Sequence, residues 1–141
     1  MFFFFSHIMH LKILLFSLLF GCIASDIGGF VFGKIFKGPK LTKISPNKTI
    51  SGAIGSLIFT CIIFSGLIFY YTNNFSYKII LISIITSIAC QFGDLFFSLL
   101  KRKAKLKNTG NLFPGHGGVL DRLDGIFFGI PIGFLTLIIF Y

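Results

Sequence analysis

The chain has 141 residues, of which 55% are hydrophobic and 21 are phenylalanine, and its mean hydropathy is +0.92. A soluble domain of this length does not have so apolar a composition, so the sequence excludes one and predicts an all-α integral membrane protein. The formal net charge is +9, from 13 Lys and Arg against 4 Asp and no Glu. Such a surplus suits anionic lipid headgroups or nucleotide phosphates as partners, and we expect no nucleic acid.

Four apolar segments, in chain order, predict transmembrane helices at about 11–32, 52–71, 79–100 and 125–141 within one membrane-embedded domain, 1–141. Segments of about 20 residues cross the ~30 Å hydrocarbon core as helices. The first segment is interrupted by His7, His10 and Lys12, and no small-x-small cleavage site follows it. We therefore expect a retained helix rather than a signal peptide.

The basic residues lie mainly in two predicted loops, about 33–51 and 101–124. Five of the 13 fall between Lys34 and Lys48, and six between Lys101 and Arg122. By the positive-inside rule, both loops face the cytoplasm, and the turn at 72–78 and both termini lie on the opposite side. Whether this charge serves topology alone or also binds phosphates stays open at this point.

The three cysteines, Cys22, Cys61 and Cys90, fall within apolar segments and have no metal-ligand spacing. We interpret them as small packing residues without a disulfide or zinc ion.

All four carboxylate side chains lie in or beside apolar runs, at Asp26, Asp94, Asp121 and Asp124. A carboxylate at the centre of a membrane helix costs roughly 2.5–3.5 kcal/mol on insertion scales, so such residues are candidates for function. The four aspartates are therefore the first residues from which to build a site.

A polar face and a glycine-rich stretch follow the third apolar segment. Asp94, Ser98, Lys101 and Arg102 are spaced i, i+4, i+7 and i+8, which places them on one face of a helix. Beyond them, Pro114 and four glycines between positions 110 and 118 interrupt a regular helix. The last two of these glycines are adjacent, so successive N–H groups there can form an anion-binding nest.

A further helix beginning near Val119 places Asp121 and Asp124 at i and i+3 beside Arg122. Carboxylates, cations and a glycine-rich helix entry are what phosphoryl or nucleotidyl transfer needs. Oxygen ligands hold one or two Mg²⁺ ions, and Lys and Arg neutralise the leaving pyrophosphate. Structural roles remain open: the two aspartates could cap the helix and pair with Arg122, and Asp94 could pair with Arg122 or Lys101.

The stretch from Ser98 to Asp124 resembles the signature of the phosphatidate cytidylyltransferase (CDP-diacylglycerol synthase) family. It agrees at every fixed position except Asn108, where the family has aspartate. The preceding Gly93-Asp94-Leu95 is similar too, and so is the first loop, with Ile50-Ser51 in place of Trp-Glu. The likeness covers roughly Ser25 to the C-terminus and corresponds to the C-terminal catalytic half of the family. The fixed positions that match in the signature are Ser98, Leu100, Lys101, Arg102, Lys107, Gly110, Phe113, Pro114, His116, Gly117, Gly118, Val119, Asp121, Arg122, Leu123 and Asp124.

The resemblance implies transfer of CMP from CTP to phosphatidate, giving CDP-diacylglycerol and pyrophosphate, with Mg²⁺ and room for a second cation. It implies a multi-pass protein of a bacterial inner membrane with a cytoplasmic active site, for which we expect a homodimer. Asp94 and Asp121 would bind the metal. The implied catalytic residues are Asp94, Lys101, Arg102, Asp121, Arg122 and Asp124. The implied substrate-binding residues are Asp26, Ser45, Lys48, Thr49, Ser98, Lys107, His116, Gly117 and Gly118; for His116, a role as ligand, base or loop anchor also stays open.

Other functions fit parts of this pattern. A CTP-dependent lipid kinase would share the basic cytoplasmic face. A non-catalytic or split-enzyme membrane subunit would explain the substitutions at Asn108 and Ile50-Ser51. A small cation channel could use an intramembrane Asp94, although the other charged groups gather at one end of the predicted helices.

Overall fold

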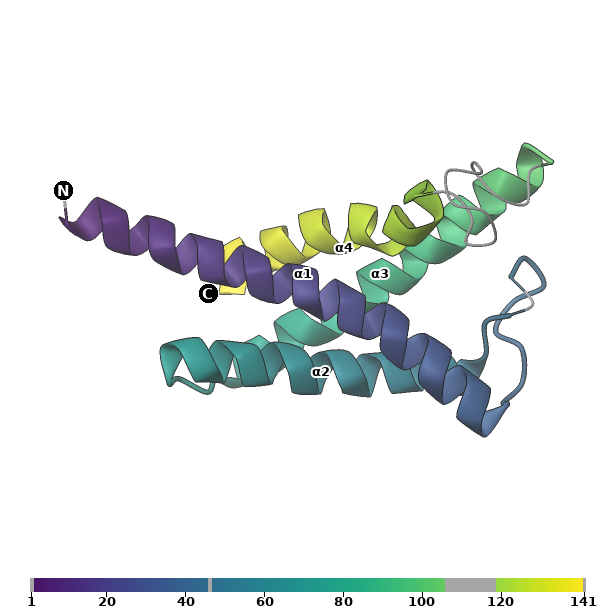
Figure 1. The fold of residues 1–141 in the computed structure, drawn as a ribbon, viewed down its shortest axis with the longest axis horizontal. Helices are drawn as coiled ribbons and strands as arrows, with labels where there is room; N and C mark the ends of the chain where they lie inside the picture. The colour runs from purple at the N-terminus through teal and green to yellow at the C-terminus, as the bar shows by residue number, and fades with distance from the viewer. Residues whose placement is uncertain (1, 46, 106–118, 141) are drawn as a thin grey trace.

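The described part of the chain is a bundle of four long helices, α1 (Phe2–Phe36), α2 (Ile50–Thr72), α3 (Tyr77–Lys103) and α4 (Val119–Phe140) (Figure 1). The computed structural model describes residues 2–45, 47–105 and 119–140, except for the side chains at 2–5, 7 and 119–122. All four helices are long and apolar enough to cross a membrane. The prediction of an all-α, multi-pass integral membrane protein is therefore confirmed.

Successive helices run in opposite directions, so the bundle has two chemically different ends (Figure 1). At the loop end, α1 and α3 finish and α2 and α4 begin; at the turn end lie the two termini and the short α2–α3 connection. The two basic segments thus share one end, as the charge pattern predicted.

The helices extend further toward the loop end than the predicted ranges. α1 continues to Phe36, α3 continues to Lys103, and α4 begins at Val119 rather than at 125. The predicted loop range 101–124 is therefore too long, whereas the prediction of a helix beginning near Val119 is confirmed. Charged residues can continue a helix where it leaves the hydrocarbon. As a result, Lys101, Arg102 and Asp124 have fixed positions on helices.

Small residues bring α1 and α2 close together. A Cβ built on Gly52 would lie 2.6 Å from the carbonyl oxygen of Gly29, and one on Gly28 would lie 3.1 Å from that of Gly55. Lipid tails are as apolar as the helices, so association in a membrane depends on close packing rather than on burial from water. Glycine on both helices permits this close approach.

Glycines at every fourth position of α4 form the contact of this helix with α1 and α3. Added Cβ atoms would collide with Leu18 at Gly133, with the sulfurs of Cys22 and Cys90 at Gly129, and with the Asp94 carboxylate at Gly125. Cys22 and Cys90 are buried and all three cysteines are free. Their predicted role as packing residues is confirmed.

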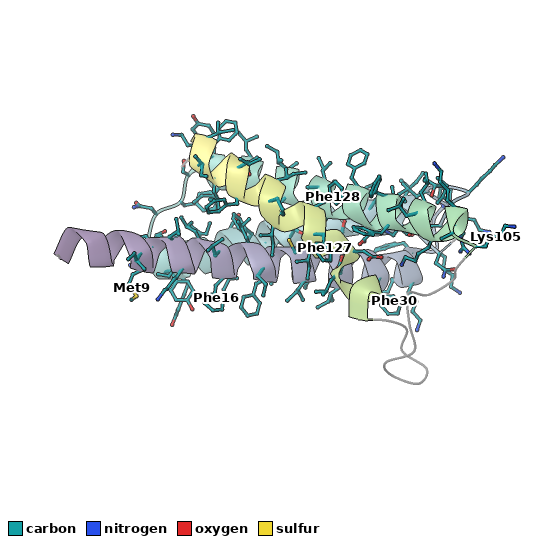
Figure 2. All side chains as sticks on the ribbon, turned by 90° about the horizontal axis from the view of Figure 1, so that it is seen from above. Met9, Phe16, Phe30, Lys105, Phe127 and Phe128 are labelled. Atoms are coloured by element: carbon teal, nitrogen blue, oxygen red, sulfur yellow. The ribbon has the colours of Figure 1, made fainter. Side chains whose placement is uncertain are left out.

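Large apolar side chains separate into an inner cluster and an outer coat. The inner cluster lies toward the turn end and is almost completely buried; its members are Leu18, Phe64, Ile68, Ile79, Ile82 and Leu137. Met9, Phe16 and Phe30 are exposed on α1, as lipid-facing side chains are (Figure 2). Nitrogen-bearing side chains gather instead at the loop end, near Lys105 (Figure 2).

Candidate active site

The connection between α1 and α2 folds back on itself and presents Lys48 to the bundle. An isolated bridge pairs Lys40 with Thr49, and the Leu41 N–H donates to the Lys48 carbonyl at 2.8 Å. The Ile50 N–H donates to the Pro39 carbonyl at 3.0 Å. These backbone bonds hold residues 39–41 beside residues 48–50, where α2 begins.

Thr49 is the N-cap of α2. Its hydroxyl accepts a hydrogen bond from the Gly52 N–H at 3.1 Å, which satisfies one of the N–H groups left unpaired at a helix start. The resemblance assigned Thr49 to substrate binding, and the geometry gives it a structural role as well. By fixing the first turn of α2, the cap also fixes the neighbouring Lys48.

Lys48 reaches across to α3 and forms an ion pair with Asp94, with Nζ and Oδ2 2.9 Å apart. The two side chains are 30% and 27% exposed, so the pair is partly shielded and still reachable from solvent. The sequence left Lys101 or Arg122 as structural partners for Asp94. The structure pairs Asp94 with the lysine that the resemblance assigned to phosphate and pairs Lys101 with Asp124, whereas the side chain of Arg122 lies outside the described residues.

Carboxylates from α1 and α3 meet where Gly125 of α4 comes closest. A Cβ at position 125 would lie 2.8 Å from Asp94 Oδ1 and 3.3 Å from Asp26 Oδ1. Asp26 is near enough to interact electrostatically with Asp94, Lys48 and Asp124. Only a glycine leaves this space open, so α4 closes over the carboxylates without displacing them.

A second ion pair joins α3 to α4 beside the first. Lys101 Nζ lies 2.8 Å from Asp124 Oδ2, with side-chain exposures of 16% and 6%. The rings of Phe96 and Phe97 pack on Phe127 and Phe128, with centroids 5.4–6.2 Å apart, and hold the same two helices together. The sequence placed Asp94 and Lys101 on one face of α3, and both contact other helices or loops across the bundle.

A cavity of about 250 Å³ lies between α1, α2, α3 and the first loop. Five predicted site residues line it: Asp26, Ser45, Lys48, Thr49 and Asp94. Sequence reasoning did not assign site roles to the other lining residues, which are Ser25, Gly29, Phe30, Leu41, Asn47, Gly52, Ala53, Ser56 and Gln91. Gln91 could have been recognised as a candidate from the sequence, because it is a polar residue one helical turn before Asp94 in a largely apolar segment.

Several predicted site residues are not brought to this cavity or lie outside the described part of the chain. Ser98 is half-buried and Arg102 exposed on α3, and neither lines the cavity. Lys107, His116, Gly117 and Gly118 lie outside the described residues, and so do the side chains of Asp121 and Arg122. The roles proposed for these residues stay predictions.

Within the described ranges, no three His, Cys or Asp side chains are grouped so as to hold a metal ion by themselves. A Mg²⁺ ion needs fewer protein ligands, because it keeps several waters and is usually bound through one or two carboxylates and the substrate phosphates. The predicted metal pair, Asp94 with Asp121, remains untested because it depends on the Asp121 side chain.

A model of the cytidylyltransferase family matches residues 1–140. The chain belongs to this family. It is 37% identical over 118 residues to the phosphatidate cytidylyltransferase of Helicobacter pylori, covering 84% of this chain and 44% of that protein. The corresponding enzyme of Staphylococcus haemolyticus is 41% identical over 116 residues, covering 81% and 45%.

The phosphatidate cytidylyltransferase of Rickettsia felis is 41% identical over 132 residues, covering 86% of this chain and 58% of that protein. The chain thus spans about half the length of the curated relatives it matches. The family resemblance read from the sequence is confirmed.

Proposed function

We propose that this chain transfers CMP from CTP to phosphatidate and so forms CDP-diacylglycerol and pyrophosphate. The observation that carries the proposal is the meeting of aspartates from α1, α3 and α4 with two lysines at the loop end of the bundle. Membrane helices rarely carry acids, and a cluster of them beside cations at one end marks a functional site. Membership of the cytidylyltransferase family supports the choice of CTP.

The donor set suits a hard divalent cation. Asp94 offers Oδ2 toward Lys48 and Oδ1 toward the narrow space that Gly125 leaves open. Asp94, with Asp121 as its predicted partner, would hold Mg²⁺, and a second cation would have Asp26 nearby. When bound, the ion would neutralise charge on the triphosphate and on the departing pyrophosphate.

The reaction needs no covalent enzyme intermediate. A phosphate oxygen of ionised phosphatidate forms a bond to the α-phosphorus of CTP. The bond from that phosphorus to the α–β bridging oxygen breaks, and pyrophosphate leaves with the electron pair. The task of the protein is therefore to position the two substrates and to stabilise the developing charge.

Lys48 and Lys101 are the cations already directed at the acidic cluster. With phosphates bound, each would contact phosphate oxygens while remaining next to its aspartate. Lys48 is carried by the first loop and Lys101 by α3, so binding the triphosphate would link the loop to the bundle.

The site belongs at the interface where a water-soluble nucleotide meets a membrane lipid. Both basic segments adjoin it, so we propose that this end faces the cytoplasm of a bacterial cell across the inner membrane. Phosphatidate and other membrane lipids would reach it from the bilayer. The bundle exposes many phenylalanines, and we expect a homodimer, which a monomeric mass in mild detergent would contradict.

The test is an assay of the purified chain in detergent with labelled CTP and phosphatidate. We expect labelled CDP-diacylglycerol with Mg²⁺ and none after chelation with EDTA. Asp94→Asn should lower the rate about 100–1000-fold, because it removes a charge that contacts the metal and phosphates. Lys78→Gln, which removes a charge from the other end of α3, should leave the rate unchanged.

Two results would count against the proposal. Full activity of Asp94→Asn would show that the acidic cluster has no role in the reaction. A folded wild-type chain that makes no CDP-diacylglycerol alone, but makes it when a second chain is co-expressed, would favour the hypothesis that this chain is one subunit of a split enzyme.

A further inference from the structure

Gln91 is held in one orientation at the wall of the cavity. It lies on α3 one turn before Asp94, and its amide nitrogen Nε2 donates to the Ala53 carbonyl at 3.2 Å and to Ser56 Oγ at 2.6 Å. Both acceptors belong to α2, so the side chain bridges the two helices.

The Ala53 carbonyl, which can only accept, decides which way the amide points. The Ser56 hydroxyl donates its own proton to the Ala53 carbonyl at 2.8 Å, which leaves Oγ as an acceptor. A reversed Gln91 amide would place Oε1 against the Ala53 carbonyl oxygen, which can only accept, even if the Ser56 hydroxyl turned to donate to it. The nitrogen therefore faces α2, and the carbonyl oxygen Oε1 points away from it.

The oxygen Oε1 is an acceptor with no donor among the described residues. In the same part of the chain, no fully buried side-chain oxygen or nitrogen lacks a hydrogen-bond partner, so Oε1 is not sealed inside the bundle. Gln91 is among the residues that line the cavity, and with its nitrogen bonded to α2 it is Oε1 that is left for a ligand there. The wall thus offers one fixed neutral acceptor.

The chemistry of the two substrates of the proposed function limits what can donate to it. Phosphatidate offers ester and phosphate oxygens, and pyrophosphate offers phosphate oxygens, all of which are acceptors when ionised. CTP has N–H and O–H donors in the 4-amino group of its ring and the hydroxyls of its ribose. Among the substrates, therefore, only the nucleoside offers a hydrogen-bond donor to Oε1.

The surroundings of Gln91 favour the ring. Ala53, Ser56 and Gly52 are small and uncharged, which suits a flat base, whereas Lys48 and Asp94 lie nearer the loop end and suit phosphates. We propose that Gln91 Oε1 accepts a hydrogen bond from the cytosine 4-amino group and so selects CTP over UTP. The inference rests on the proposed function, which supplies CTP as the nucleotide.

The selection follows from the difference between the two bases. Cytosine presents an N–H donor at position 4, whereas uracil presents a carbonyl oxygen there. With UTP, two acceptors would face each other, and the amide could not turn without placing Oε1 against the Ala53 carbonyl oxygen. Sites built to bond a specific donor discriminate strongly against analogues that lack it.

The experiment compares CTP, UTP and dCTP, by kcat/KM in the assay above and by equilibrium binding to the full chain in detergent. Gln91→Met keeps the side-chain length and removes Oε1, and we expect it to lower the preference for CTP over UTP about 10–100-fold. Ser56→Ala removes one of the two hydrogen bonds that hold the Gln91 amide and should lower the preference for CTP over UTP by a smaller factor. Ser83→Ala, whose hydroxyl bonds Ile80 and Cys61 on the same helix pair, should keep the preference.

Each result bears on the inference separately from the proposed function. An unchanged CTP-to-UTP ratio in folded Gln91→Met, with wild-type turnover intact, would overturn the role of Gln91 and leave the activity standing. A change only in the CTP-to-dCTP ratio would also overturn it, because the donor would then be a ribose hydroxyl. Without wild-type turnover, the proposed function fails, and the binding ratios still decide the role of Gln91.

Discussion

The turn end and the loop end of this bundle are packed by different means. At the turn end, Phe64, Ile68, Ile79 and Leu137 fill the space between the helices and leave almost no exposed surface. At the loop end, glycines let the helices approach, and charged groups occupy the space between them. The turn end is held together by apolar packing, whereas the loop end contains a cavity and ionic groups.

This difference separates stability from chemistry along the bundle axis. Close packing of large side chains stabilises helix association and leaves no room for a ligand. Charges near the membrane surface are costly unless they are paired, and the two ion pairs at the loop end reduce that cost. Substitutions at the two ends should therefore have opposite effects on stability and activity.

Of the substitutions that compare the two ends, Gly125→Ala should have the largest effect on activity. The new Cβ would lie 2.8 Å from Asp94 Oδ1 and 3.2 Å from the Cys90 carbonyl, so the carboxylate or α4 must move. Alanine is the better helix former by about 1 kcal/mol, which offsets part of the strain. We expect roughly 100-fold lower CDP-diacylglycerol synthesis with nearly unchanged thermal unfolding, each one measured in detergent.

Gly66→Ala is the matched control for this substitution. Gly66 lies on α2, and a Cβ there would meet no atom within 4 Å. It should keep full activity. If Gly125→Ala did the same, the close contact of α4 with Asp94 would have no functional meaning.

Phe64→Ala should have the reverse effect at the turn end. Phe64 is completely buried in the inner cluster, and its loss would leave a cavity that costs about 3–5 kcal/mol of unfolding free energy. Activity per folded molecule should stay within about threefold of wild type. The measurement is denaturant unfolding beside the activity assay.

Phe69→Ala is the control, because Phe69 is on the same helix and half exposed. Phe69→Ala should lower the free energy of unfolding much less than Phe64→Ala does. A Phe64→Ala chain that remained as stable as wild type, or folded fully and lost activity, would show that the two ends are coupled.

The smallest effect is expected at the cap that joins the first loop to α2. Thr49→Ala removes the hydroxyl that accepts from the Gly52 N–H and should cost about 1 kcal/mol of unfolding free energy. Because Lys48 is next to the cap, KM for CTP should rise modestly. Thr49→Ser keeps the hydroxyl and should restore both values; failure of this rescue would argue against capping as the role of Thr49.

Much of the fold was predictable because it depends on local composition. Apolar runs long enough to cross a bilayer specified four helices, and the clustering of basic residues specified which connections share one end. The aspartates could be singled out as candidate site residues because acids are rare in membrane segments. The cysteines could likewise be assigned to packing, since their spacing suits no metal.

The contacts between helices were not predictable in the same way. Spacing placed Asp94 and Lys101 on one face of α3, but it could not show that Asp94 meets Lys48 while Lys101 meets Asp124. Nor could it show that Gln91 bridges to α2. Partners on other segments depend on how the helices are rotated against each other.

The sequence by itself determined how many helices in the described residues are long and apolar enough to cross a membrane, which ends they share and which residue types carry charge there. Only the tertiary structure decided which charges pair and where the cavity lies. The physical reason is that the composition of a segment decides whether that segment forms a membrane helix, whereas an ion pair between two helices requires that they approach each other closely. In this chain, glycines on α1, α2 and α4 set that approach, and their effect depends on the surfaces they face.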